Sequence, residues 1–582
     1  HELTRPMVIM VAGMGAAGCL MAMPPTRIRI SGGMALALVL LLAAVFLGDM
    51  AEGMAPPADA DSLAYHFVFA KHMAQTGGLV FEPRAVDGAI PQLLHVTYAM
   101  AMLLGGEQGL TLWCGLTGWL VVPLLLAAAR PHVPLSWALA IAAVFVTLPA
   151  MLYGGGTGQA EPRTAAFALA ATIAAALARR QDQGLRQALG WALLAGLFAG
   201  FYAGSKFPGL LLVATCGLAL LCHRRGLGLA AVFSLAAAAM GFQWYFWNVL
   251  NSGDPVFPML FHWGAVRDGL WNTAQDDYFR SMFSGTELAV AKSPLTALTY
   301  PFLATFWPMN AFDAGRIGFG VFPAIMLPFA VAGLWTCRRR LGGSPLTVIA
   351  AITLLTYLLW FLLGPSQRVR HLLPILPAFL LIMTVAVFRA TQRWPWLLRP
   401  AVVAAAACLT LQLGGTALAD AKAIRHVLTR ESREDFLNRN VAGASTAAWI
   451  SANVEDGAFI FTIERQLNFL LKQRHFYGND MFQALVEIRP DNQDRQKYWR
   501  QLRERNFSHV LVRVILDGPL PAGGSIPLTM GLADDGCLSL VKGFPQTELQ
   551  SRTLPGLGSK IRWLHLYRLH PESCPYEDKA AS

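Results

Sequence analysis

Residues 56–78 read PPADADSLAYHFVFAKHMAQTGG and follow a long apolar run. Two acids, Asp59 and Asp61, open this stretch, and an amphipathic pattern typical of a helix then carries Tyr65 and His66. A carboxylate pair at the mouth of a membrane helix is costly, so such residues usually mark a functional site. We therefore interpret the stretch as a candidate catalytic loop and expect the rest of the chain to build the cavity around it.

The composition is that of a membrane protein. Of the 582 residues, 55% are hydrophobic and only 14% are charged, whereas soluble domains carry roughly 25% charged residues. Apolar runs of about 17–22 residues alternate with short breaks that contain arginine, which predicts a polytopic α-helical membrane protein. The composition becomes that of a soluble protein near residue 420, so we expect a transmembrane domain at 1–419 and a second domain at 420–582.

The net charge of +11 is modest for a chain of this length. In a membrane protein it is typical of cytoplasmic arginine and of attraction to anionic lipid headgroups. The sequence contains no nucleic-acid-binding motif. Membrane lipids are therefore expected partners, and nucleic acids are not.

The arginine residues predict which ends of the helices lie in the cytoplasm. Arg27 and Arg29 follow an apolar run at 7–23 and precede another at 33–50. Positively charged residues favour the cytoplasmic side, so Asp59 and Asp61 are expected to face the outside. Further basic breaks occur at Arg130, Arg179–Arg180, His223–Arg225, Arg338–Arg340, Arg389, Arg393 and Arg399.

Apolar segments fit between these breaks and give about 12 spans. The expected segments are 134–152, 162–178, 188–204, 207–222, 227–248, 320–336, 345–363, 371–388 and 398–418, with 108–128 reaching Arg130 from outside. The number of membrane crossings must place each basic break on the cytoplasmic side, and this requires 91–105 to be a half-buried or re-entrant helix and not a full span. Outer loops are expected at 51–107 and 249–318, and the final span places the C-terminal domain outside.

Several charges break this topological pattern. Lys206, Arg368 and Arg370 lie in outer turns between apolar helices, as do Glu161 and Arg163. Positive charge on the outer side needs a partner, and an anionic lipid-linked phosphate is a good one. The alternative is that these cations pair with Glu161, with Asp254 of a predicted turn, or with a lipid headgroup.

The C-terminal region alternates helices with short apolar strands, which predicts a small α/β domain. We expect helices at 425–440, 445–454, 464–473 and 496–506, and strands at 458–463, 509–516 and 563–569. The region contains no dinucleotide, P-loop or nucleophile-elbow motif. Its two cysteines, Cys537 and Cys574, could form a disulfide if the domain is extracytoplasmic, or they could be two unrelated thiols.

Several segments, in this order, resemble the GT-C superfamily of polyprenyl-phosphate-dependent membrane glycosyltransferases. The kinship looks closest to the bacterial family-39-type proteins, which include protein mannosyltransferases and aminoarabinose transferases. The matching segments are DSLAYHFVFAKHMAQTGGLVFEP (61–83), AGFYAGSKFPGL (199–210), WYFWNVLNSGDPVFPML (244–260), RVRHLLPILP (368–377), SREDFL (432–437) and AAWISANV (447–454). In the fourth segment, His371 stands where the family has tyrosine.

The resemblance implies a multi-pass protein of the bacterial inner membrane whose catalytic face and C-terminal domain are periplasmic. It implies an inverting transfer of sugar from a polyprenyl-phosphate donor to a lipid, glycan or protein acceptor. The first-loop acid acts as general base in the family, and Asp61 is the match, with Asp59 an extra acid upstream. Arg370 matches the family's arginine, and Glu161 matches a second outer acid.

The residue types themselves suit this chemistry. Sugar transfer from a lipid phosphate needs a base, cations for the leaving phosphate and a cavity poor in water. Inversion needs only one strategic carboxylate, because no covalent sugar intermediate forms. Asp61 is the preferred base, although Asp59 or Asp61 could instead cap the following helix. The pair could also hold a divalent cation such as Mg²⁺ or Mn²⁺, although two acids are weak support for a metal site.

The other candidates carry two interpretations each. Lys206, Arg370 and Arg368 are candidates for binding phosphate. Glu161 either orients the acceptor or pairs with Lys206, and His371 lies beside the phosphate candidates. His66 either positions substrate or packs in the core, and the same holds for Tyr65, which could stack on a sugar.

Two rival functions remain at this point. A transporter or flippase of lipid-linked sugars would also need outer cations and a lipid groove, but transporters tend to show inverted repeats, and none is visible here. A non-catalytic glycan-assembly protein is the other rival. The retained acid and cations argue against it.

Overall fold

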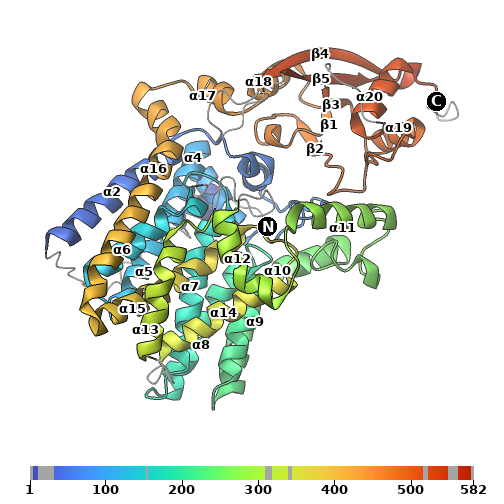
Figure 1. The fold of residues 1–582 in the computed structure, drawn as a ribbon. Helices are drawn as coiled ribbons and strands as arrows, with labels where there is room; N and C mark the ends of the chain where they lie inside the picture. The colour runs from blue at the N-terminus through green and yellow to red at the C-terminus, as the bar shows by residue number, and fades with distance from the viewer. Residues whose placement is uncertain are drawn as a thin grey trace.

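The computed structural model describes residues 4–10, 32–152, 155–307, 318–337, 344–514, 522–547 and 561–577. A bundle of long helices forms the body, and a smaller domain with a β-sheet caps one end of it (Figure 1). The expected class, a polytopic helical membrane protein with a small C-terminal α/β domain, is confirmed. Most of the expected first span at 7–23, Arg27 and Arg29, and Arg338–Arg340 lie outside the described residues.

Six helical stretches in the described part of the chain are long and apolar enough to cross a membrane. They are Gly33–Met54, Leu93–Ala129, Gly226–Ser252, Pro345–Leu363, Val369–Arg393 and Pro395–Thr429. The bundle helices are α2 (Gly33–Met54), α4 (Leu93–Gly118), α5 (Val121–Ala129), α6 (Leu135–Val146), α7 (Ala160–Ala178), α8 (Leu185–Ala203), α9 (Gly209–Leu221), α10 (Gly226–Ser252), α12 (Pro294–Phe306), α13 (Phe322–Cys337), α14 (Pro345–Leu363), α15 (Leu376–Arg393) and α16 (Leu398–Thr429). These bounds follow the apolar runs closely, and the total of about 12 spans stays a prediction.

The segment expected at 91–105 is a separate helical piece. Helix α4 is interrupted at Gly105 and Gly106, and Gly106 has a positive φ of 63°. Only glycine adopts such a conformation without strain, so the sequence itself ends the first piece here. That this piece is re-entrant in the membrane stays a prediction.

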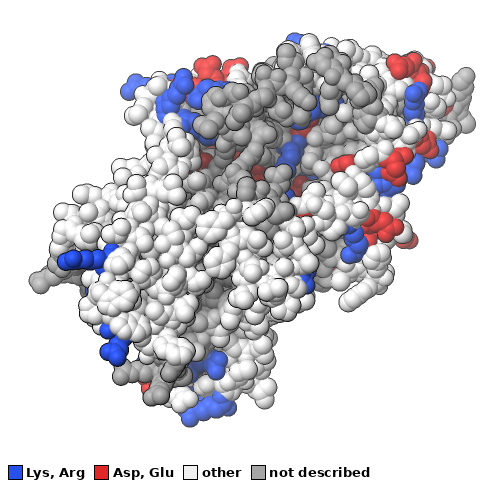
Figure 2. Space-filling view, viewed as in Figure 1, with Lys and Arg blue, Asp and Glu red and all other residues white. Residues whose placement is uncertain are grey.

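Among the described basic breaks, those in the turns between α7 and α8 and between α9 and α10 lie together at the end of the bundle away from the sheet (Figure 1). Arg179 donates from Nη2 to the carbonyl of Cys222 at 3.2 Å, and Arg225 donates from Nη1 to the carbonyl of Gln183 at 3.4 Å. Figure 2 shows charged side chains on the sheet domain and basic ones at the opposite end, with a largely uncharged face between them. This separation is what the arginine pattern predicts for a chain that crosses a membrane.

Close packing of α8 on α10 brings the end of α8 into place. A Cβ on Gly196 would lie 2.3 Å from the carbonyl of Phe233, and one on Gly200 would lie 2.5 Å from that of Ala237. Small residues four apart let membrane helices approach this closely. The contact holds the turn after Ala203, which carries Lys206.

The outer segment after α10 contains a tight turn and helix α11 (Thr273–Glu287). Asp254 accepts backbone hydrogen bonds from Val256 and Leu260, both at 2.8 Å. It is therefore a turn-forming residue and not a partner for an outer arginine. Asn272 caps α11 by accepting a hydrogen bond from the backbone of Gln275 at 2.9 Å.

The C-terminal domain is a three-layer α/β structure. Its sheet has the order β2-β1-β3-β5-β4, with β1 parallel to β2 and β3, and β5 antiparallel to β3 and β4. The elements are β1 (Phe459–Thr462), β2 (Arg474–Tyr477), β3 (His509–Val514), β4 (Leu538–Thr547), β5 (Ile561–Leu569), α17 (Arg433–Asn440), α18 (Ala444–Asn453), α19 (Arg495–Glu504) and α20 (Ser525–Asp534). Successive strand residues face opposite sides, so Ile460 packs in the core with α18, and Phe461 packs in the core with α19 and α20.

Two expected helices of this domain differ from prediction. The charged helix expected at 425–440 is divided, because α16 continues to Thr429 and Arg430 then adopts a positive φ of 54°. The helix expected at 464–473 is wrong, since only the short turn Arg465–Leu467 forms. Leu467 and Leu471 pack in the domain core, whereas Phe469 packs against the bundle. Because these neighbouring side chains pack into two different cores, the segment does not form the helix that its apolar spacing predicts.

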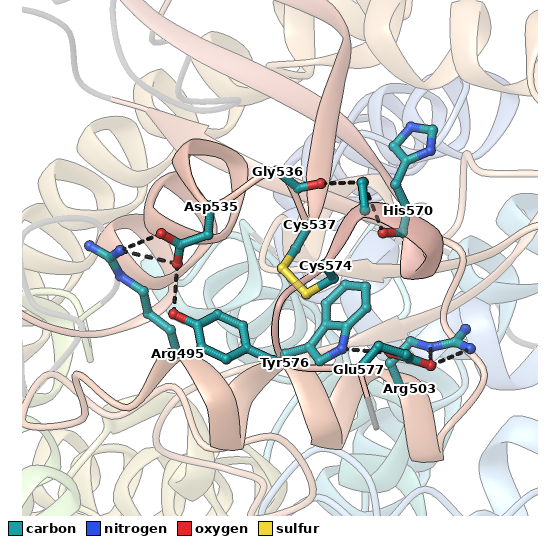
Figure 3. Close-up of a disulfide and its surroundings, with 11 residues drawn as sticks. Arg495, Arg503, Asp535, Gly536, Cys537, His570, Cys574, Tyr576 and Glu577 are labelled. Atoms are coloured by element: carbon teal, nitrogen blue, oxygen red, sulfur yellow. Dashed lines mark hydrogen bonds and ion pairs between the residues drawn. A yellow bond between two sulfur atoms is a disulfide. The ribbon is translucent and has the colours of Figure 1, made fainter. Parts of the chain in front are cut away.

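Cys537 and Cys574 form a disulfide that ties the end of the described chain to the start of β4 (Figure 3). Of the two alternatives left open for these cysteines, the structure has the disulfide and not two unrelated thiols. Beside it, the Trp499 ring nitrogen donates to Glu577 at 2.8 Å, and Tyr576 donates to Asp535 at 2.9 Å. These contacts pack the last described residues onto α19 and α20.

Candidate active site

Asp59 starts the short helix that carries the candidate base. Its Oδ2 accepts hydrogen bonds from the backbone N–H of Ser62 at 2.9 Å and from the Ser62 hydroxyl at 2.8 Å. This is the geometry of a helix N-cap, which satisfies an otherwise unpaired amide. A π-helical turn, Ser62–His66, follows and leads into α3 (Phe67–Thr76).

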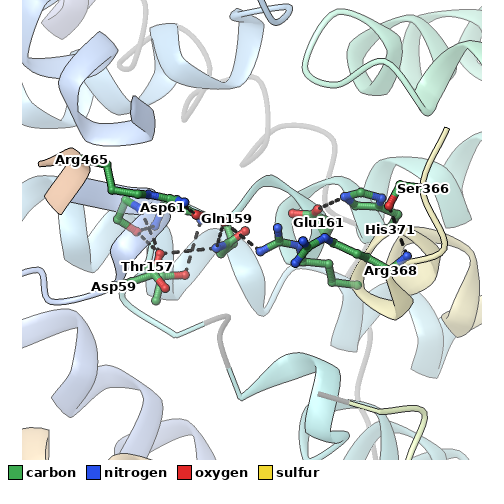
Figure 4. Close-up of polar contacts among 12 residues, drawn as sticks. Asp59, Asp61, Thr157, Gln159, Glu161, Ser366, Arg368, His371 and Arg465 are labelled. Carbon is green, nitrogen blue, oxygen red and sulfur yellow. Dashed lines mark hydrogen bonds and ion pairs between the residues drawn. The ribbon is translucent and has the colours of Figure 1, made fainter. Parts of the chain in front are cut away.

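Asp61 lies between two arginines from distant parts of the chain, and Figure 4 shows one of them, Arg465, beside it. Arg370 donates from Nη1 to Asp61 Oδ2 at 2.8 Å, and Arg465 donates from Nη2 to Oδ1. Gln159 donates from Nε2 to Oδ2 at 3.0 Å. Burial alone would raise the pKa of Asp61, but the two guanidinium groups outweigh it and hold this pKa well below its usual range.

The two outer arginines of the predicted turn point to different partners. Arg370 reaches Asp61, whereas Arg368 donates from Nε to both oxygens of Glu287 at 2.7 and 2.8 Å. The partners expected for Arg368, namely Glu161, Asp254 or a lipid headgroup, do not include this acid at the end of α11. Burial would raise the pKa of Glu287, but Arg368 outweighs it and lowers this pKa. Arg368 therefore fastens α11 to the bundle.

Lys206 and Glu161 form an ion pair, which is the second of the interpretations given for Glu161. The Glu161 side chain is only 2% exposed and lies in the first turn of α7, where the helix dipole favours a negative charge. His371 lies on the other side of this carboxylate, with its Nε2 3.8 Å from Oε1. In Figure 4, Gln159 lies between Asp61 and Glu161, so the two charged groups share one region.

A buried arginine shapes the loop that delivers Gln159. Arg163 donates to the carbonyls of Gly155 at 2.5 Å, Gln159 at 3.0 Å and Cys114 at 3.0 Å. Gly158 lies against the helix that runs from Asp61 through the π-helical turn into α3, which we call the catalytic helix. A Cβ at this position would lie 2.7 Å from that of His66, so the close approach requires glycine. The role of Gln159 was not predicted, and its only sequence signal is its place in the same outer turn as Glu161.

Tyr65 and His66 are adjacent aromatic groups beneath Asp61. Their ring centroids lie 4.1 Å apart, and His66 Nδ1 shares a hydrogen bond of 2.8 Å with His95 Nε2. Burial, with His95 and Lys206 nearby, lowers the pKa of His66 well below its usual value. His66 is therefore neutral at neutral pH and pairs in the core, whereas Tyr65 lines a cavity.

Residues 465–471, which we call the docking segment, attach the C-terminal domain to the catalytic helix. The Phe469 amide donates to the Leu63 carbonyl at 3.0 Å, and the Asn468 side chain donates to the Ala64 carbonyl at 3.0 Å. Lys71 donates to the carbonyls of Phe469 and Leu471, both at 2.8 Å. Lys71 is thus a structural contact between the helix that follows Asp61 and the docking segment.

Arg465 begins this segment and is the site residue that sequence reasoning missed most clearly. Nothing in its surroundings in the sequence distinguishes it from other arginines of the domain. It completes the arrangement around Asp61 only because the docking segment is fixed to the helix that bears Asp61.

The residues do not form a ready site for a divalent cation. Asp59 is occupied as a helix cap, and Asp61 already accepts from Gln159 and two arginines. No group of three or more His, Cys, Asp or Glu side chains suited to a metal occurs among the described residues. Mg²⁺ takes six ligands, mostly carboxylates and water, and two committed acids fit this poorly.

Comparison with solved structures identifies the fold. ArnT from Cupriavidus metallidurans bound to undecaprenyl phosphate matches over 91% of this chain and 97% of its own, at 13% identity and a TM-score of 0.54. The apo state of the same protein matches over 92% and 98%, at 15% identity and a TM-score of 0.54. The arabinofuranosyltransferase AftD from mycobacteria matches over 94% of this chain and 42% of its own, at 15% identity, and its TM-score of 0.43 carries no argument.

No family model and no curated protein sequence matches the chain. The likeness to ArnT extends over nearly the full length of both chains, bundle and C-terminal domain together. The fold that the resemblance implies, a helical membrane bundle with a small C-terminal sheet domain as in ArnT, is therefore confirmed.

Proposed function

We propose that this protein is an inverting glycosyltransferase that moves a sugar from a polyprenyl-phosphate donor to an acceptor hydroxyl at the periplasmic face. One observation carries the proposal: a carboxylate at the mouth of the bundle is held between the guanidinium groups of Arg370 and Arg465. Guanidinium groups bind phosphate as readily as carboxylate, through paired charge-assisted hydrogen bonds. The fold of a protein solved with undecaprenyl phosphate bound supports the choice of donor.

The ion pairs give Asp61 a resting state and an active state. While both arginines contact it, its lowered pKa makes it a weak base. The donor phosphate competes for the same guanidinium groups, and as they turn to it the pKa of Asp61 rises toward its ordinary value. The base is thus strengthened when the donor is present, which limits reaction in its absence.

The reaction then follows with its charges balanced. Asp61 takes the proton of the acceptor hydroxyl while that oxygen forms a bond to the anomeric carbon of the sugar. The bond between this carbon and the phosphate oxygen breaks, and the electron pair leaves with the phosphate. Arg370, Arg465 and Lys206 are the cations that stabilise the charge gained by the departing polyprenyl phosphate. A single displacement inverts the anomeric centre.

Glu161 has a supporting role in this scheme. Its ion pair holds the Lys206 ammonium at the turn after α8, and His371 Nε2 lies 3.8 Å from the same carboxylate. A lysine is a mobile point charge, so fixing it in advance reduces the entropy lost when phosphate arrives. Glu161 is therefore a positioning residue, and no contact of Glu161 with the reacting atoms is needed.

Two features favour a periplasmic site. A disulfide ties the C-terminal domain together, and disulfides persist in oxidising compartments such as the bacterial periplasm. The basic breaks lie at the opposite end of the bundle, where the positive-inside rule puts the cytoplasm. The multi-pass chain would then lie in the inner membrane with its catalytic face outward.

The Asp61→Asn variant tests the proposal. Loss of a general base typically costs about 10²- to 10⁴-fold in rate. We expect at least the lower figure for sugar transfer from synthetic polyprenyl-phosphate sugars in proteoliposomes. Asp277→Asn, which changes an exposed acid of α11 in the outer segment, is the matched control and keeps its activity. If Asp61→Asn transfers sugar at the wild-type rate, the mechanism is contradicted. If intact donor crosses the membrane and is not cleaved, the protein is a transporter instead.

A further inference from the structure

A cavity of about 590 Å³ lies between the catalytic helix and the C-terminal domain. One wall is formed by Ala64–His72 of the catalytic helix, another by residues 80–84 of the first outer loop, and the third by the docking segment and β2. The cavity starts at Ala64 and Tyr65, within one helical turn of Asp61. It is large enough for one or two sugar rings, since small-molecule sites begin near 300 Å³.

Basic side chains dominate the lining of this cavity. The five Lys and Arg residues that line it are Lys71, Arg84, Lys472, Arg474 and Arg505. Glu82 is the one acid among its lining residues. Arg84 is neutralised by Glu82 and Asp87, both at 3.1 Å, and Lys472 by Asp456 at 2.9 Å.

The other three cations have little or no carboxylate to balance them. Lys71 donates to two backbone carbonyls, and burial lowers its pKa to about 8. Arg474 lies over the Phe459 ring, with its guanidinium carbon 4.1 Å from the ring centroid. Arg505 donates to the Gln501 carbonyl at 3.3 Å, and its carboxylate neighbour among the described residues is the exposed Glu504, at 3.6 Å. Lys71 and Arg505 are partly buried, whereas Arg474 is exposed at the edge of the cavity. Cations that face the same space are stabilised when an anion occupies it.

Aromatic rings complete the lining, among them Tyr65, Phe476 and Tyr477. A cavity lined by rings with a few fixed charges is typical of sites that bind small polar molecules in one orientation. The apolar face of a sugar ring can pack on such rings while its substituents reach the charges. The lining therefore suits a saccharide that carries an acidic group.

We propose that this cavity is the acceptor site and that the acceptor is an anionic saccharide bearing a phosphate or carboxylate. This inference rests on the proposed transferase function. Arg474 and Arg505 bind the acidic group, and the acceptor hydroxyl passes Tyr65 to reach Asp61. Since the docking segment and β2 form one wall, the C-terminal domain selects the acceptor while the bundle holds the donor.

Binding measured without donor tests this inference separately from the transferase function. The full-length protein in phosphatidylcholine nanodiscs is titrated by calorimetry with glucose 6-phosphate, glucuronic acid and glucose. We expect both acidic sugars to bind at least tenfold more tightly than glucose. Arg474→Gln and Arg505→Gln each weaken that binding about tenfold, the loss of one charge-assisted hydrogen bond. Arg500→Gln removes an exposed charge of α19 outside the lining and leaves binding unchanged.

A second arm of the experiment distinguishes a membrane-anchored acceptor from a soluble one. Nanodiscs that also contain a phosphorylated glycolipid compete with the soluble sugars if the natural acceptor is membrane-anchored, and do not compete if it is a soluble glycan. Equal binding of glucose and glucose 6-phosphate, or unchanged binding by folded Arg474→Gln and Arg505→Gln, overturns the proposal. Acidic-sugar binding in a protein that never cleaves the donor would retain the cavity assignment and refute only the transferase function.

Discussion

Replacing Arg465 by glutamine tests how the C-terminal domain acts on the candidate base. Arg465 contacts Asp61 Oδ1, while Arg370 remains on Oδ2 at 2.8 Å. The substitution removes one of the two cations that keep the pKa of Asp61 low. We expect that pKa to rise toward its ordinary value.

The size of the shift follows from charge, distance and exposure. Two unit charges 4 Å apart interact by about 4 kcal/mol at an effective dielectric constant of 20 and by about 1 kcal/mol in water. The Arg465 side chain is 43% exposed, so screening favours the lower part of this range. A loss of about 1–2 kcal/mol corresponds to roughly one pKa unit.

The assay is the pH dependence of kcat/KM for sugar transfer, which reports the pKa of groups in the free enzyme. Protonated Asp61 cannot accept a proton, so the rate falls on the acid side. In Arg465→Gln this acid limb moves up by about one pH unit. Under the proposed function the rate at every pH also falls, because the variant lacks one of the cations proposed to bind the phosphate.

Arg513→Gln is the matched control. Arg513 also pairs with a carboxylate, Glu464, in the same domain, but it does not contact Asp61. Its variant should lose stability without moving the acid limb. An unmoved acid limb in Arg465→Gln, with transfer still measurable, refutes the reasoning that links this arginine to the base.

Three further predictions concern stability. Asp59→Ala removes the helix cap and lowers the free energy of unfolding by about 1 kcal/mol, seen as a lower melting temperature, whereas Asp59→Asn keeps the cap and most of that stability. Lys206→Met leaves the Glu161 carboxylate buried without its cation and lowers the free energy of unfolding by about 3–5 kcal/mol. Adding Glu161→Gln restores the melting temperature but leaves the KM for the donor raised. A fully restored KM argues against phosphate binding by Lys206. Replacing Cys537 and Cys574 by serine removes a covalent link across 37 residues and lowers the free energy of unfolding of the C-terminal domain by about 2–4 kcal/mol. Calorimetry of the variant against the wild type measures this loss, and an unchanged transition would show that the bond is absent in the protein.

The membrane helices were predictable because their apolar runs have no alternative place to be buried. The run at 345–363 coincides with α14, and that at 33–50 lies within α2. The unusual position of the charged residues in the outer turns was also predictable, since a lysine or arginine there conflicts with the tendency of positive residues to lie on the cytoplasmic side. Their partners were less visible: Lys206 meets Glu161 as one interpretation had it, but Arg368 meets Glu287, which lies 81 residues away.

The contacts of the docking segment could not be read from the chain. Arg465 and Asp61 are separated by 404 residues, and no periodicity or turn signal links positions so far apart. The pattern at 464–473 even favoured a helix, because its apolar residues have helical spacing but attach to two different cores. Strands β2 and β4 were missed for a related reason: β2 is short, and both lie at the edges of the sheet, where apolar alternation is weak.

The attachment of residues 465–471 to the helix after Asp61 has a consequence for biosynthesis. A ribosome inserts the bundle first, and the arginine that completes the arrangement around Asp61 emerges 404 residues after that acid. A nascent or prematurely terminated product would therefore occupy the membrane with an incomplete arrangement around Asp61 and without the cavity wall formed by the docking segment and β2. Under the proposed function, such fragments should spare the donor pool, because they lack one of the cations that would bind the donor phosphate.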